Sequence, residues 1–185
     1  PSLGKGCWYG APTCDDMTSL VQTADVRNTI NEVLVNAGKA MGAYMRRKVY
    51  EPSLVLCSTA RRTKETVELL LPALQSGPKL RYKRELYLAD WPVLLNEIHK
   101  SPPSASPLLI VGHNPGLEQL ALALALHPRN AAERARAQRL AQKFPTGALA
   151  VLDFDGESWR AAKPGTGHLV DYVRPKDLGM DGDGS

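Results

Sequence analysis

The sequence is poor in cysteine and contains no long hydrophobic run. Its three cysteines, Cys7, Cys14 and Cys57, are an odd number and lack the spacing of a metal site or a disulfide framework, which favours a reducing, cytoplasmic compartment. The longest strongly apolar stretch, residues 120–126, is far shorter than the ~20 residues of a membrane-spanning helix. No basic segment followed by an apolar one opens the chain, so we expect neither a secretory signal nor a membrane partner.

The sequence also lacks a large excess of charge of either sign. The chain of 185 residues carries 23 Lys and Arg against 19 Asp and Glu, a formal net charge of +4 with a pI near 9.0. The basic residues are scattered, and no aromatic-studded basic motif is present, so we expect no nucleic-acid partner and a slight preference for phosphorylated ligands. With 43% hydrophobic and 23% charged residues, the composition is that of one globular domain, at about 150 residues per domain.

Short apolar runs alternate with amphipathic patterns along the chain. Helical spacing predicts helices at 27–48, 60–74, 91–99, 117–124 and 130–143. Apolar runs predict strands at 53–57, 80–82, 108–111, 148–154 and 168–175. This alternation is typical of an α/β sandwich with a mainly parallel sheet. The polar, glycine-rich residues 179–185 are predicted to be disordered.

Polar side chains follow two of the predicted strands. Ser58 and Arg62 follow the predicted strand at 53–57, and Gly-His-Asn at 112–114 follows the predicted strand at 108–111. Ligands of parallel α/β sheets bind beyond the carboxyl ends of the strands, so Arg62 and His113 converge if both strands lie near the middle of the sheet. His113 would then stand where a strand leads into a helix N-terminus, a place that suits phosphate. The alternative is a histidine that only hydrogen-bonds the turn.

Five segments, taken in order, resemble the histidine phosphatase superfamily, and specifically the SixA-type phosphohistidine phosphatases. They span about residues 41–178 and read SLVLCSTARRTKETVELL, ELYLAD, LLIVGHNPGLEQL, KFPTGALAVLDF and DYVRPKDL. The resemblance implies a three-layer α/β/α sandwich with a mainly parallel sheet, phosphoglycerate mutase-like, in a single domain at 1–178. Residues 1–40 of that domain are atypical.

The resemblance also implies a phosphate pocket of two histidines and two arginines. One histidine attacks phosphorus, and water then hydrolyses the phosphohistidine intermediate. Carried over to this sequence, Arg62 and His113 are catalytic, and Ser58 and Asn114 join them in binding the substrate. The adjacent Arg61 is expected to face solvent or a carboxylate. The implied substrate is a protein carrying phosphohistidine, or a small phosphate ester, and no metal or cofactor is implied.

The N-terminal part departs from this family pattern. An Arg-His motif is expected directly after the first strand, and the sequence has none. SixA-type chains commonly continue the motif with a Lys, a Ser and then a Trp. Aligning SLGKGCWYGAP with the motif and this continuation matches Lys5 and Trp8 but leaves Ser2 and Leu3 in place of the arginine and the nucleophilic histidine. A central strand is then missing, unless residues 2–9 or another segment fills the gap. Such a pattern is typical of a truncated or frame-shifted coding region, or of a diverged pseudoenzyme.

The sequence therefore predicts a SixA-type phosphohistidine phosphatase that keeps a phosphate-binding half-site and has little or no activity. The alternative is a non-catalytic phosphate or phosphoprotein-binding module. Glu85 lies in the region where some superfamily members carry a general-acid carboxylate. The alternative for Glu85 is a surface or helix-capping role. Asp90 is expected to cap the helix that begins at Trp91.

Overall fold

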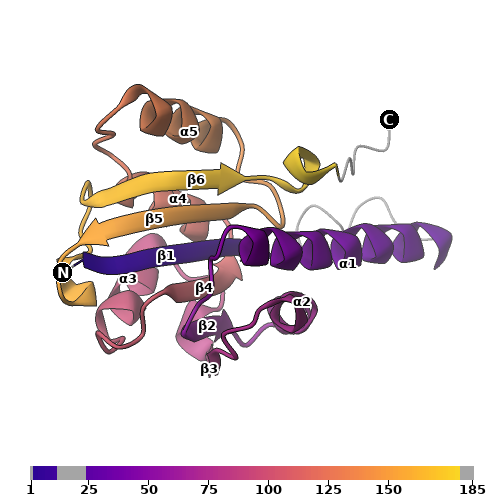
Figure 1. Ribbon diagram of the computed structural model, residues 1–185. Helices are drawn as coiled ribbons and strands as arrows, with labels where there is room; N and C mark the ends of the chain where they lie inside the picture. The colour runs from indigo at the N-terminus through magenta and orange to yellow at the C-terminus, as the bar shows by residue number, and fades with distance from the viewer. Residues whose placement is uncertain (1, 12–23, 180–185) are drawn as a thin grey trace.

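A six-stranded sheet forms the middle layer of the protein (Figure 1). The computed structural model describes the backbone of residues 2–11 and 24–179 and the side chains of residues 35–179. The strands are β1 (Ser2–Ala11), β2 (Leu54–Ser58), β3 (Lys79–Lys83), β4 (Leu108–His113), β5 (Leu149–Asp155) and β6 (Gly167–Val173), in the order β3-β2-β4-β1-β5-β6. Only β5 runs against the direction of the others, so the prediction of a mainly parallel sheet is confirmed.

Helices cover both faces of this sheet. On one face lie α1 (Ala24–Arg47) and α2 (Arg61–Leu70); on the other lie α3 (Trp91–His99), α4 (Gly116–Leu124) and α5 (Ala131–Gln142). The described part of the chain also contains four short 3₁₀ helices: η1 (Leu71–Ala73), η2 (Arg84–Leu86), η3 (Trp159–Ala161) and η4 (Pro175–Leu178). Within the described ranges no helix is both long and apolar enough to cross a membrane.

The alternating burial of β4 shows how the three layers are held together. Leu108 and Ile110 pack into the core beneath α3 and α4, whereas Leu109 and Val111 pack beneath α1 and α2. A strand buried on both faces reads as a continuous apolar run, which is how β2, β4 and β5 appear in the sequence. The predicted three-layer α/β/α sandwich is confirmed.

The predicted helices lie close to the observed ones, with one instructive difference. The helix expected at 91–99 has those same limits, but the helix expected at 60–74 ends at Leu70 and continues as the 3₁₀ helix η1. Pro72 causes the change, because proline has no N–H to donate to the preceding turn of an α-helix. The predicted disordered tail lies outside the described residues apart from Gly179, which ends η4 in the left-handed conformation with φ of 77°.

Asp90 occupies the N-cap position of α3 but makes no side-chain cap hydrogen bond. A cap side chain normally accepts from the second or third helical N–H. Here the second residue is Pro92, which has no N–H, and the N–H of Val93 donates to the backbone carbonyl of Asp90 (3.1 Å). The position was predicted correctly and the capping contact was not.

The N-terminal segment forms a central strand. β1 pairs in parallel with β4, from Gly6 opposite Leu108 to Ala11 opposite His113, and antiparallel with β5. The central strand that was expected to be missing is therefore present, and the N-terminal segment forms it. The alignment that put Ser2 and Leu3 directly after the first strand is wrong, because both residues begin β1, at the end remote from His113. Strands β4 and β5 would otherwise leave ladder N–H and C=O groups unpaired.

Candidate functional site

Two neighbouring strands place the predicted site residues at the carboxyl ends of the parallel strands. β2 ends at Ser58 and β4 ends at His113, and the two strands pair in parallel. Helix α2 begins immediately after β2, so Arg62 lies in its first turn. The structure thus brings Ser58, Arg62 and His113 together, although Ser58 and His113 are 55 residues apart in the sequence.

The imidazole of His113 is held on both sides. Its Nε2 lies 2.9 Å from Ser58 Oγ, and its Nδ1 lies 3.0 Å from Arg62 Nη2. An arginine only donates, so Nδ1 accepts, and in the neutral ring Nε2 carries the proton and donates to Ser58. His113 is only 2% exposed and Ser58 is fully buried. The cluster is therefore a fixed arrangement of one cation, one neutral imidazole and one hydroxyl.

His113 is neutral at neutral pH. Burial, followed by the positive charge of Arg62, lowers the pKa of His113 from 6.5 to about 4. Both causes penalise the imidazolium form.

Stability is expected to fall as the pH drops from about 6.5 to about 4. The unfolded chain protonates His113 near its ordinary pKa of 6.5, whereas the folded chain keeps it neutral down to about 4, so added protons favour unfolding in this window. The loss approaches about 3 kcal/mol at the lower end. Urea unfolding at pH 7, 5.5 and 4.5 measures it, with His113→Gln as the comparison. An equal pH dependence in both proteins would contradict the assignment.

Arg62 has donors to spare. Its Nε is buried and has no hydrogen-bond partner within residues 35–179, while Nη2 is the atom that contacts His113. A guanidinium has five N–H donors in a planar fork, which suits paired oxygens of a phosphate or carboxylate. Arg61 differs, because its side chain is 92% exposed and its Nε donates to Glu65 at 2.7 Å. Arg61 thus faces solvent and a carboxylate.

The turn between β2 and α2 is fastened by Thr63, which the sequence reasoning did not single out. Its buried hydroxyl lies 2.9 Å from the carbonyl oxygen of Ser58 and 2.8 Å from that of Ala60. The N–H of Ala60 in turn donates to Ser58 Oγ at 3.4 Å. These contacts fix the position of Ser58 beside His113.

Asn114 points its amide nitrogen toward another segment. Its Nδ2 donates to the backbone carbonyl of Phe144 at 2.7 Å, and its buried Oδ1 has no partner among the described residues. The side chain therefore ties the turn after β4 to the loop before β5. Its predicted role in binding substrate stays a prediction.

Tyr87 is a neighbour of His113 that sequence reasoning missed. The two rings lie 5.5 Å apart between centroids, nearly perpendicular at 74°. Tyr87 belongs to ELYLAD, a segment singled out for its resemblance without a role for this residue. Glu85 of the same segment is exposed on η2.

No histidine stands beside His113 in the sheet. The residue of β1 paired with it is Ala11, preceded by Gly10 opposite Gly112. The chain has three other histidines, and their contacts lie outside the cluster. His99 Nε2 contacts the carbonyl of Ala162 at 2.7 Å, and His127 lies against Gly165.

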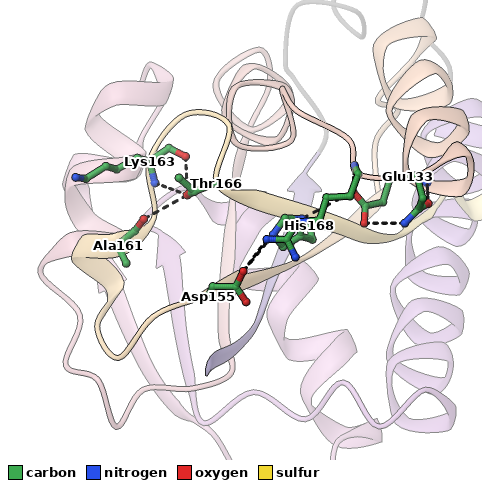
Figure 2. A network of polar contacts seen from close by, with 8 residues as sticks. Glu133, Asp155, Ala161, Lys163, Thr166 and His168 are labelled. Atoms are coloured by element: carbon green, nitrogen blue, oxygen red, sulfur yellow. Dashed lines mark hydrogen bonds and ion pairs between the residues drawn. The ribbon is translucent and has the colours of Figure 1, made fainter. Parts of the chain in front are cut away.

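The last histidine, His168, lies near the start of β6, at the opposite edge of the sheet. Figure 2 shows it between Glu133 and Asp155, with nitrogen–oxygen distances of 3.8 and 3.6 Å. Even there, no three histidine, cysteine or acidic side chains among the described residues gather closely enough to hold a metal ion.

No family model matches the chain, but curated relatives do. The uncharacterized protein Rv1276c of Mycobacterium tuberculosis is 33% identical over 135 residues, which make up 73% of this chain and 81% of the relative. The uncharacterized protein ML1117 of Mycobacterium leprae is 33% identical over 144 residues, 77% of this chain and 83% of the relative. The chain belongs to the family of these mycobacterial proteins.

Comparison with solved structures identifies the fold of the chain. The SixA protein from Nakamurella multipartitia has a TM-score of 0.66 at 23% identity, covering 93% of this chain and 96% of its own. The protein histidine phosphatase SixA complexed with tungstate has a TM-score of 0.64 at 17% identity, covering 94% and 99%. A phosphoglycerate mutase from Plasmodium falciparum has a TM-score of 0.50 at 13% identity, covering 92% and 97%. The chain therefore has the phosphoglycerate mutase-like fold of these SixA structures, which is the fold that the resemblance implied.

Within this fold the described cluster offers donors for an oxyanion. Arg62 supplies a positive charge and unused N–H groups, and the N-terminal turns of α2 and α4 begin at the same edge of the sheet. At the register position beside His113, however, stands an alanine, Ala11, and a methyl side chain has no lone pair to attack phosphorus. The arrangement is suited to binding a phosphoryl group and lacks a nucleophile at that position.

Proposed function

We propose that this protein recognises phosphohistidine on proteins in a SixA-type pocket, and that this chain binds the phosphoryl group without hydrolysing it. The observation that carries the proposal is the Ser58–His113–Arg62 cluster with Ala11 as the β1 partner of His113. A SixA structure that contains tungstate, an oxyanion with the tetrahedral shape of phosphate, supports the choice of ligand. Residues 1–178 form the proposed domain.

Arg62 would take two phosphoryl oxygens through Nε and one terminal nitrogen. In this binding mode the Nη2 hydrogen bond to His113 is exchanged for one to the phosphate, so the guanidinium charge is paired with the ligand. The nearby dianion then favours protonation of His113, whose Nδ1–H can donate to a third oxygen. The positive charges of Arg62 and protonated His113 would then neutralise the two negative charges of the ligand. Ser58 keeps the ring oriented throughout, through its contact with Nε2.

Hydrolysis of phosphohistidine is the second candidate. Favouring it is the complete Arg62 and His113 half of the site, which the resemblance assigns to catalysis. In the SixA-type reaction a nitrogen–phosphorus bond to the enzyme's nucleophilic histidine forms while the bond to the substrate's imidazole breaks, and water then releases phosphate. This candidate requires a nucleophile from outside the described cluster. A cytoplasmic location belongs to both proposals, since the free thiol of Cys57 suits a reducing compartment.

Binding and turnover separate the two candidates. Orthophosphate and vanadate are expected to bind saturably, measured by calorimetry, while a phosphohistidine peptide releases no phosphate above the rate without protein. Release that His113→Ala abolishes would select the phosphatase. Absence of any phosphate or vanadate binding by the folded wild-type protein would overturn both proposals.

A further inference from the structure

An exposed aromatic ring lies directly against the buried histidine of the pocket. Tyr87 is 55% exposed, and its ring centroid is 5.5 Å from that of His113. Both nitrogens of His113 are occupied, one by Ser58 and one by Arg62. The Tyr87 ring therefore flanks the imidazole while keeping more than half of its own surface in solvent.

The loop that carries Tyr87 is held in place. Leu86 before it is fully buried, and the backbone oxygen of Ala89 approaches Gly116 so closely that a Cβ on Gly116 would lie 2.0 Å away. Leu88 has a φ of 48°, a left-handed conformation that is strained for a leucine. Strain of this kind persists only where the surroundings impose it, and it is common at ligand sites. Tyr87 is thus presented at a defined position.

We propose that Tyr87 determines specificity by stacking on an aromatic ring that carries the phosphoryl group. The inference rests on the proposed function. In phosphohistidine the phosphorus is bonded to the imidazole itself, so a phosphoryl group held by Arg62 brings that ring close to His113 and its neighbour Tyr87. Aromatic rings attract one another at centroid separations of about 4.5–7 Å. Phosphoserine places a flexible methylene at this point and gains nothing from the stack.

The shared chemistry of the ligand is a flat ring with a phosphoryl group attached. Phosphohistidine and phosphotyrosine both have it, but phosphotyrosine places an oxygen between phosphorus and ring. A preference for the first over the second would identify the shorter spacing as the one that fits. Tyr87 acts through its ring face, so its hydroxyl is dispensable.

Calorimetric titration of four ligands tests the proposal. The first is inorganic phosphate, and the other three are versions of one peptide that carry a stable phosphohistidine analogue, phosphotyrosine or phosphoserine at the same position. The wild-type protein is expected to bind at least one ring-borne form about tenfold more tightly than the phosphoserine peptide. Tyr87→Phe keeps this preference. Tyr87→Ala removes it and leaves the affinity for inorganic phosphate within about twofold. Tyr82→Ala is the matched control, because Tyr82 is also exposed (44%) but lies on the edge strand β3.

Two results would overturn the inference. One is a preference that survives Tyr87→Ala or is absent from the wild-type protein; the other is an equal loss of affinity for inorganic phosphate and the peptides, which would make Tyr87 a support for the pocket. Failure of the wild-type protein to bind inorganic phosphate is a different result, because it removes the proposed function itself.

Discussion

The double variant Gly10→Arg with Ala11→His is expected to release phosphate from a phosphohistidine peptide about 100-fold faster than the unaltered chain. The resemblance to SixA-type phosphatases implies an Arg-His motif where the first strand ends, and β1 ends at Gly10 and Ala11, opposite Gly112 and His113. The substitution therefore introduces an imidazole at the register position beside His113. Loss of a nucleophile costs enzymes about 10⁶-fold in rate, so even an imperfectly placed histidine recovers a measurable part. Phosphate release and a phosphoryl label on position 11 provide the measurement.

The matched control is Ser2→Arg with Leu3→His, which adds the same two side chains where the sequence alignment placed the motif. Ser2 pairs with Asp155 at the far end of β1, so this variant is expected to remain inactive. Activity in the control, or a well-folded Gly10/Ala11 variant that binds phosphate and forms no phosphoenzyme, would contradict the position assigned to the missing nucleophile.

Arg62→Ala is expected to weaken phosphate binding about 100-fold. The variant removes the cation of the cluster and its unused Nε donor. Charge-assisted hydrogen bonds contribute about 1.5–3 kcal/mol each, and a factor of 100 corresponds to about 2.7 kcal/mol. Calorimetric titration with orthophosphate measures the loss. Removal of the same charge raises the pKa of His113 from about 4, which NMR titration of the imidazole detects independently.

Arg61→Ala serves as the control for charge alone. Arg61 is adjacent in sequence and carries the same charge, but its side chain is exposed and paired with Glu65. Phosphate affinity is expected to stay within about twofold, since exposed ion pairs contribute little. Equal losses in the two variants would mean that phosphate responds to the general positive potential and not to a specific contact.

Periodicity explains why much of the architecture was predictable. The strands β2, β4 and β5 are buried on both faces, so each appears in the sequence as a short apolar run. Their order with the amphipathic helices leads to a parallel sheet. Ser58 and His113 end two strands that pair directly with one another in parallel, so their proximity follows from this pairing.

The strand pairing of β1 and the contact of Tyr87 with His113 could not be predicted from periodicity, and the physical reason is the same for both. SLGKGCWYGA contains three glycines and a lysine and has weak strand character on its own, so its conformation depends on the pairing groups that β4 and β5 present on either side. The contact between Tyr87 and His113 depends on the path of a loop through a left-handed leucine. Both features are decided by tertiary contacts.

The position of β1 in the sheet also pairs segments that lie far apart in the sequence. β1 alone joins β3-β2-β4 to the β5–β6 pair, and its partners in β4 and β5 lie roughly 100 and 150 residues further along the chain. Closing such long loops costs entropy before any pairing energy is recovered, and sheets dominated by distant pairings fold slowly. Local units such as the β5–β6 hairpin can form first, and the two halves of the sheet are united when β1 inserts. The two pairings of β1 therefore close the longest loops in the sheet.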